Sequence, residues 1–173
     1  MTAIYSMNVE NMESLNLDAT DLRLLDALQH DASRTNQQLA QDCHLSPPTC
    51  LRRVQRLRAL GLIEQQVAVL SAERLGAAVL TALVEVVLDR QDAESLQAFE
   101  TRACADDAVQ QCYRVSPGPD FMLVVTVRDM PGYHALVQRL FTADANVRNV
   151  KAFFSVRRAK FQTLLPLPRP EGP

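Results

Sequence analysis

The run of residues 35–61, TNQQLAQDCHLSPPTCLRRVQRLRALG, predicts two short helices separated by a three-residue turn. The first helix begins with a capping box formed by Thr35 and Gln38. The second follows Ser46, which we expect to accept hydrogen bonds from free backbone amides, and a proline occupies its first position, where no N–H is needed. The glycine that closes the run can adopt the left-handed conformation, so this helix spans about 47–60.

The second helix is predicted to have two contrasting faces. At about 100° per residue, an apolar set gathers on one side, which we expect to pack: Cys50, Leu51, Val54 and Leu57. A polar set falls opposite: Thr49, Arg52, Arg53 and Arg56. Arginine forks suit phosphates and the O6/N7 edge of guanine, and a threonine can contact a thymine methyl or a phosphate. We therefore expect an outward arginine row that enters the major groove of DNA; the alternative interpretation is a solvated basic face.

A third helix precedes these two, with Asp18 as its cap and leucines at helical spacing up to Asp31. Three small helices can share one core, so residues 17–62 are predicted to form a helix-turn-helix domain. Residues 18–64 contain six arginines and six acids, so the domain is neutral overall. A neutral module with few phosphate contacts binds DNA weakly, which favours a dimer or a larger oligomer.

Composition narrows the class of function. The net charge of -2 excludes a generally basic coat for nucleic acid, and 5% aromatic residues without Trp gives little support to single-strand stacking. The first sixteen residues do not resemble a secretory signal and no stretch approaches a membrane span, so we expect a cytoplasmic protein that does not interact with membranes.

The cysteines and histidines indicate neither a metal site nor a catalytic site. The four cysteines form no Cys-x-x-Cys motif, and no histidine lies at ligand spacing from them. We interpret the cysteines as reduced core residues, with a redox switch as the alternative. No nucleophile has an acid or base partner, so we predict no catalytic residue and no cofactor.

The pattern changes beyond a predicted hinge linker at residues 63–76. Apolar runs with alternating or β-branched character and two helical stretches follow in the order strand 79–88, helix 92–103, strand 109–116, strand 121–128, helix 131–141 and strand 147–158. This order is the split βαβ of ferredoxin-like domains, so the fold class is α+β with a βαββαβ domain at 77–163. Residues 1–16 and 164–173 are predicted to be flexible tails.

Both alternating sets of the first predicted strand are largely apolar. In a sheet with both helices on one face, the second face then also needs a cover. No segment of the chain is left to supply it, so we expect a second copy to pack there, sheet against sheet, as a homodimer.

From about Leu17 to Phe161 the sequence resembles the Lrp/AsnC (feast/famine) family of regulators. The resemblance is carried by LDATDLRLLDALQHDAS, LSPPTCLRRVQRLRALGLI, VLTALVEVVL, DFMLVVTVRDM and the last strand. It implies a winged or extended helix-turn-helix and a βαββαβ sensor domain that dimerises and commonly forms octamers as tetramers of dimers. It also implies transcription regulation and, in many members, amino-acid binding in clefts between sensor domains.

The resemblance assigns candidate residues by motif. Those implied to line the recognition helix and bind DNA are Ser46, Pro48, Thr49, Arg52, Arg53 and Arg56. Those implied to bind an effector are Gly118, Asp120, Met122, Asp129, Phe153 and Phe154. The chain departs from the family loop at Pro117, where a glycine is usual, and at Phe121, where a tyrosine is usual. The alternatives are a turn residue and a helix cap for the two aspartates, and plain core or interface for the methionine and the phenylalanines.

The sequence thus predicts a homo-oligomeric transcription regulator that binds double-stranded DNA at a pseudo-palindromic operator and responds to an amino acid or related metabolite. One alternative is a metabolite-binding protein whose helices dock a protein partner, which requires exposed apolar anchors that the outward face is expected to lack. A stand-alone enzyme is disfavoured because the sequence has no acid, base and nucleophile set.

Overall fold

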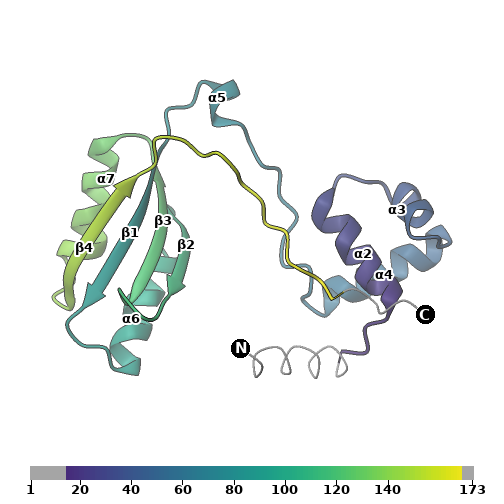
Figure 1. Cartoon of the computed structure of the whole chain (residues 1–173), viewed down its shortest axis with the longest axis horizontal. Coiled ribbons are helices and arrows are strands. Elements are labelled where there is room, and N and C mark those ends of the chain that lie inside the picture. Colours follow the sequence, from purple (N-terminus) through teal and green to yellow (C-terminus); the bar gives the residue numbers. More distant parts are fainter. Residues whose placement is uncertain (1–14, 169–173) are drawn as a thin grey trace. The chain divides into compact units, whose positions relative to one another are not determined.

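The computed structural model describes residues 15–168, which fall into two compact units (Figure 1). The first extends to Ala68 and includes the C-terminal segment from Phe161; we call it the reading head. The second, Val69–Lys160, is the sensor domain. Most of the tail predicted at 1–16, and residues 169–173 of the other predicted tail, lie outside the described residues. No helix within the described range is long and apolar enough to cross a membrane.

The reading head contains three helices, α2 (Ala19–His30), α3 (Asn36–Asp42) and α4 (Pro47–Ala59). Capping boxes begin α2, where Asp18 and Asp21 bond reciprocally, and α3, where Thr35 and Gln38 do the same. One apolar core joins the helices: Leu24, Leu28, Leu39, Ala40, Cys43, Cys50, Val54 and Leu57. Residues 61–71 contain no strand, so the wing implied by the resemblance has no counterpart in the described part of this unit.

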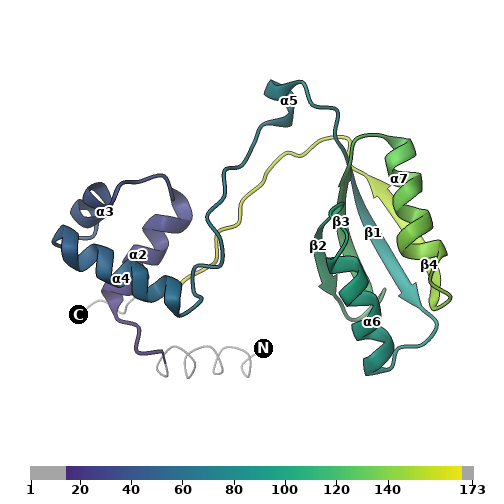
Figure 2. The same cartoon turned by 180° about the vertical axis from the view of Figure 1, so that it is seen from behind.

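The sensor domain contains β1 (Leu80–Leu88), α6 (Ala93–Cys104), β2 (Val109–Arg114), β3 (Phe121–Val127), α7 (Met130–Leu136) and β4 (Val147–Phe154). The strands form one antiparallel sheet in the order β2-β3-β1-β4, and α6 and α7 cover the same face (Figure 2). The predicted ferredoxin-like α+β fold is therefore confirmed.

The structure differs from the prediction in several details, since the first three strands are one or two residues shorter and three larger differences occur. A short helix, α5 (Ala72–Leu75), lies within the predicted linker and ends at the left-handed Gly76. The helix α7 continues as a π-helix over Val137–Thr142. The last strand ends at Phe154 because Ser155 donates the final backbone bond to Thr81 and the chain then leaves the sheet.

Alternate residues of the strands separate the two faces of the sheet. The helix-covered face contributes the core, in which the rings of Phe99 and Phe121 lie 4.8 Å apart between centroids. The opposite face has no cover within the described chain and carries partly exposed apolar side chains, which we call the open face: Leu83, Tyr113, Met122, Val124 and Phe153.

Candidate nucleic-acid interface and effector site

The turn between α3 and α4 holds these two helices at a fixed angle. The Asn36 side-chain amide donates to the carbonyl oxygen of Pro47 at 2.9 Å, which joins the start of α3 to the start of α4. His44 adopts a left-handed φ of 57°, and the next residue, Leu45, donates its N–H to Ala40 at 2.8 Å. The amides of His44 and Leu45 are thus bonded to the end of α3, which fixes the conformation of the turn.

Three faces run along α4. The buried face consists of Cys50, Val54 and Leu57. A half-buried flank consists of Thr49, Arg53 and Arg56. The exposed outer face consists of Pro48, Leu51, Arg52, Gln55 and Ala59. The outer positions follow a spacing of three and four residues, so they form one continuous stripe that begins in the first turn.

The flank arginines are bonded to the start of α2. Arg53 donates to Asp18 at 2.7 Å and to Asp21 at 2.8 Å. Arg56 donates to the other carboxylate oxygen of Asp21 at 3.0 Å and to the Leu15 carbonyl at 2.8 Å. Asp21 is only 1% exposed, so this buried carboxylate depends on the two guanidinium groups for its neutralisation.

The pKa values of this network agree with its geometry. Hydrogen bonds to Asp21 and Asp18 raise the pKa of Arg53. Burial opposes ionisation of Asp18, but hydrogen bonds from the Asp21 amide and from Arg53 outweigh it and lower the pKa of that carboxyl. Two acids and two arginines make the network neutral, so it fixes α4 against α2 and adds little net positive charge.

The prediction that all three arginines form one outward row is wrong, because only Arg52 lies on the outer face. Arg52 is exposed and makes no hydrogen bond or ion pair with any other described residue, whereas Arg53 and Arg56 point along the flank toward α2. The prediction considered only acids between Asp42 and Glu64, and the partners come from earlier in the chain.

Leu51 was also placed on the wrong face by the sequence analysis. It lies about 100° from Cys50 around the helix and is 47% exposed. The expectation that the outer face carries no apolar side chain is therefore wrong. Gln55 is exposed on the same stripe and was missed, although its position four residues after Leu51 was a sufficient signal.

Ser46 occupies the cap position of α4 without making the predicted cap bond to an amide. Its hydroxyl is instead hydrogen-bonded to that of Thr49 at 2.8 Å. Pro48 lies exposed beside them. These three predicted DNA contacts are thus brought together at the N-terminal end of α4.

The predicted effector residues occupy three places in the sensor domain. Gly118, with a φ of 128°, lies in the exposed loop that joins β2 and β3. Asp120 ends this loop, and its carboxylate accepts the Leu88 N–H at 2.7 Å. Met122 and Phe153 belong to the open face.

The remaining two residues lie at the other end of β3. Asp129 caps α7 by accepting the Gly132 N–H at 2.8 Å. Phe154 packs edge-on against Tyr133 of α7, with 5.0 Å between ring centroids. Eight residues lie between Asp120 and Asp129, and the seven of them that form β3 alone span roughly 24 Å at about 3.4 Å per residue. One chain therefore does not bring the six residues into one pocket.

The cysteines fall into two pairs of free thiols. Cys43 and Cys50 are buried in the reading-head core, as predicted. Cys104 is exposed at the end of α6, so its interpretation as a core residue is wrong, and half-buried Cys112 lies near it in β2. Burial, and then the neighbouring Cys104, raise the pKa of Cys112 to about 12.

Comparison with known families agrees with both units. Residues 17–58 match the AsnC-type helix-turn-helix domain, and residues 81–165 match the Lrp/AsnC ligand binding domain. The chain is 35% identical to an uncharacterised helix-turn-helix-type transcriptional regulator of Haemophilus influenzae, over 83% of this chain and 85% of the relative. It is 35% identical to the leucine-responsive regulatory protein of Rhizobium meliloti, over 83% and 92%.

Solved structures show the same arrangement of elements. An AsnC family transcriptional regulator from Agrobacterium tumefaciens is 30% identical, with a TM-score of 0.76 over 87% of this chain and 97% of the other. A transcriptional regulator from Neisseria meningitidis, crystallised with L-Met, is 28% identical, with the same TM-score and the same coverage.

A capped helix-turn-helix joined to a ferredoxin-like ligand-binding domain defines a class of two-domain transcription regulators that bind double-stranded DNA. The chain belongs to the Lrp/AsnC family within that class.

Proposed function

We propose that the outer face of α4 reads base edges in the major groove while the flank network holds the helix in position. The observation that carries this proposal is the free guanidinium of Arg52, which is exposed within two turns of the helix N-terminus. Recognition helices contact bases with their N-terminal residues. Arginine suits guanine, glutamine suits adenine, and the methyl groups of Leu51 suit thymine, so Arg52, Gln55 and Leu51 supply three different contacts.

The proposal gives Ser46, Pro48 and Thr49 a supporting role at the phosphate backbone. Their exposed positions at the helix start suit hydroxyl and backbone contacts to phosphate. Arg53 and Arg56 retain N–H donors beyond those that bind Asp21, so they can contact phosphate from the flank.

The open face is proposed to form the dimer interface. Strand pairing places Leu83 between Val124 and Phe153, which makes an apolar row across three strands. The adjacent row contains Tyr113 and Met122. It continues with Glu85 and Lys151, which form an ion pair of 4.0 Å. A second copy packed on this face would bury these side chains, and four such dimers would make the octamer of the same proposal.

The dimer sets the form of the operator. Two reading heads related by a two-fold axis bind half-sites about 34–36 Å apart, or a multiple of that distance, on one face of the duplex. The expected operator is therefore a pseudo-palindrome. Dimerisation also adds the phosphate contacts that a single neutral head lacks.

The effector is proposed to be an amino acid bound by the sensor domain. Support comes from the match to a ligand binding domain and from the relative crystallised with L-Met. One carboxylate oxygen of Asp120 and one of Asp129 make no hydrogen bond with a described residue, so each can pair with an α-ammonium group. Because the candidate residues are separated in one chain, a complete pocket requires a second copy, which couples binding to assembly.

The DNA proposal is tested by Arg52→Ala with Arg90→Ala as control, since both remove one exposed arginine and the control lies in the sensor domain. Fluorescence anisotropy on the chain's own upstream region should show affinity about 5- to 150-fold weaker for Arg52→Ala, which corresponds to one lost bidentate base contact. Equal affinities at fixed salt for both variants would refute the role of the outer face.

The dimer proposal is tested by Leu83→Lys, with Ala98→Lys on exposed α6 as control. Leu83 is already 43% exposed in one chain, so the change leaves the fold of a single chain intact. Sedimentation velocity should show smaller species for Leu83→Lys alone.

The effector proposal is tested by Asp120→Asn and Asp129→Asn. Asparagine can still accept the backbone bonds to Leu88 and Gly132 but lacks the charge that binds an ammonium. Thermal shifts produced by L-Met, L-Leu or L-Glu should shrink in these variants while the unliganded melting temperature stays within a few degrees. Unchanged ligand shifts would leave both aspartates as a turn residue and a helix cap.

A further inference from the structure

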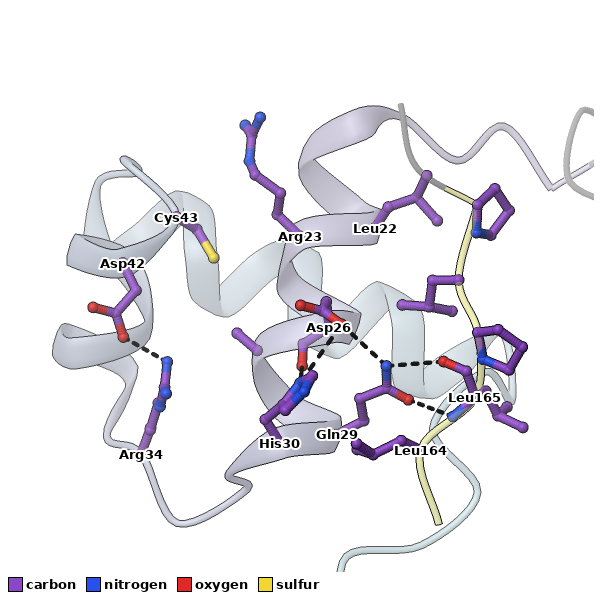
Figure 3. A pocket seen from close by; sticks show the side chains of 14 residues that line it. Leu22, Arg23, Asp26, Gln29, His30, Arg34, Asp42, Cys43, Leu164 and Leu165 are labelled. Atoms are coloured by element: carbon purple, nitrogen blue, oxygen red, sulfur yellow. Dashed lines mark hydrogen bonds and ion pairs between the residues drawn. The ribbon is translucent and has the colours of Figure 1, made fainter. Parts of the chain in front are cut away.

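Residues 164–168 of the C-terminal segment lie against α2 of the reading head, although residues 164–173 were predicted to be a flexible tail (Figure 3). Leu164 and Leu165 lie beside Gln29, and the segment continues alongside α2 toward its N-terminal half. With α2 and α3 it encloses a groove of about 980 Å³, to which residues 164–168 all contribute.

A single glutamine recognises the backbone of this segment. The Gln29 amide nitrogen donates to the Leu165 carbonyl at 3.1 Å, and the Leu165 N–H donates to the Gln29 amide oxygen at 2.9 Å. This pair of bonds copies the exchange between two residues of a β-ladder. The two bonds fix which residue of the segment lies opposite Gln29, and they do so through the backbone of Leu165.

Asp26 orients the glutamine for this task. Its carboxylate accepts a hydrogen bond of 3.1 Å from the same Gln29 nitrogen, so the amide oxygen faces the Leu165 N–H. The reversed amide would set an oxygen against the Asp26 carboxylate and would lose both bonds to the segment. The bond to Asp26 therefore favours the amide orientation that binds the segment.

The sequence of the segment suits this mode of binding. Pro166 and Pro168 restrict the two residues before them to extended conformations, so Leu165 and Leu167 lose little freedom on docking. Prolines also lack the N–H groups that a docked strand would leave unpaired. Of the leucines, Leu167 is half-buried against the groove, while Leu165 keeps its side chain 69% exposed and contributes its backbone.

We propose that the α2 surface of the reading head is a binding site for an extended leucine-proline peptide, and that its resident ligand is the C-terminal segment of the same chain. This proposal does not depend on which residues contact DNA or effector. Covalent attachment gives the segment a high effective concentration at the site, so two backbone bonds and a few apolar contacts suffice.

Docking makes the segment a second connector between the two units. Ten residues lie between Phe154, the end of β4, and Leu165, so the eleven Cα–Cα steps limit the length of this connector to about 40 Å. The first connector has 20 residues between Ala59 and Leu80 and would be roughly 70 Å long if fully extended. The docked segment is therefore the shorter of the two connectors.

Hydrogen–deuterium exchange of the full-length chain tests the docking directly. The Leu165 amide should exchange at least tenfold more slowly in the wild type than in Gln29→Ala, because that variant removes the acceptor of its N–H. Gln97→Ala, an exposed glutamine on α6, is the matched control and should leave exchange unchanged. Exchange at unfolded-chain rates in the wild type would overturn the proposal.

Repeating the exchange measurement at several protein concentrations shows whether the docked segment belongs to the same chain or to a second copy. Protection by a segment of the same chain is independent of protein concentration, whereas protection that decreases on dilution would mean that a second copy supplies the segment and would contradict the assignment.

A peptide competition tests the site itself. A labelled peptide of residues 160–168 should bind the chain truncated after Thr163 at least tenfold more tightly than the chain truncated after Pro168, whose site is occupied by its own segment. Gln29→Ala in the shorter chain should abolish binding. Equal binding to the two truncated chains would refute a specific site. If DNA binding failed in every variant while these results held, only the proposed DNA role would be lost.

Discussion

Replacing Arg53 with alanine separates the two roles that α4 combines. Arg53 is bonded to Asp18 and to the buried Asp21, whereas its neighbour Arg52 makes no bond to another described residue. We expect Arg53→Ala to destabilise the reading head and Arg52→Ala to leave its stability nearly unchanged.

The size of the expected loss in unfolding free energy follows from the burial of the ion pair. Breaking a fully buried ion pair costs about 3–5 kcal/mol, and breaking an exposed pair costs about 1 kcal/mol or less. Asp21 is 1% exposed, but the Arg53 side chain is 23% exposed and Arg56 remains as a partner. The expected loss is therefore about 2–3 kcal/mol, which for a small domain lowers the melting temperature by about 10 °C or more. Arg52→Ala should stay within about 0.5 kcal/mol.

Differential scanning calorimetry of the full-length chain measures both values. A third variant, Leu57→Ala, identifies the reading-head transition because this side chain is completely buried in that core. Equal melting temperatures for Arg52→Ala and Arg53→Ala would refute the argument, as they would show that Asp21 does not need Arg53. The same result would reinstate the simpler picture of three equivalent outward arginines.

Three further outcomes are expected in the sensor domain. Hydrogen bonds from Arg139 lower the pKa of Asp106 below its ordinary value of 3.8, so the pair stabilises fully above the unfolded pKa and its contribution is lost as pH falls through the folded value. Asp106→Asn should therefore be less stable than wild type in urea at pH 6, and the gap should close below pH 3.8. Iodoacetamide at pH 8 should modify exposed Cys104 far faster than Cys112, whose pKa of about 12 leaves almost no thiolate; comparable labelling by mass spectrometry would contradict this. Phe99→Ala should cost about 3–5 kcal/mol in denaturant unfolding, because the ring is fully buried; a loss below about 1 kcal/mol would argue against the assigned core.

Local features of the fold were predictable because their causes are local. The capping boxes at Asp18 and Thr35 depend on residues three positions apart, and the alternation in β1 and β3 depends on neighbours two positions apart. The order of elements then leaves few topologies, and the ferredoxin-like sheet is one of them.

The candidate site was predictable only in part. The cluster of Ser46, Pro48 and Thr49 at the start of α4 follows from the cap and the proline. The effector residues were assigned by resemblance, and the separation of Asp120 from Asp129 follows from strand β3, which holds them at opposite ends of one sheet.

The sequence by itself determined the helices, the strands and their order, since periodicity and end signals act within a few residues. Only the tertiary structure decided which arginines of α4 remain free, because the acid that neutralises Arg53 and Arg56 lies more than thirty residues earlier in the chain. It also decided where the C-terminal segment lies, because this segment is bonded through Leu165 to Gln29, 136 residues earlier in the chain. Pairings over such distances are created by packing, which brings together groups that no local pattern relates.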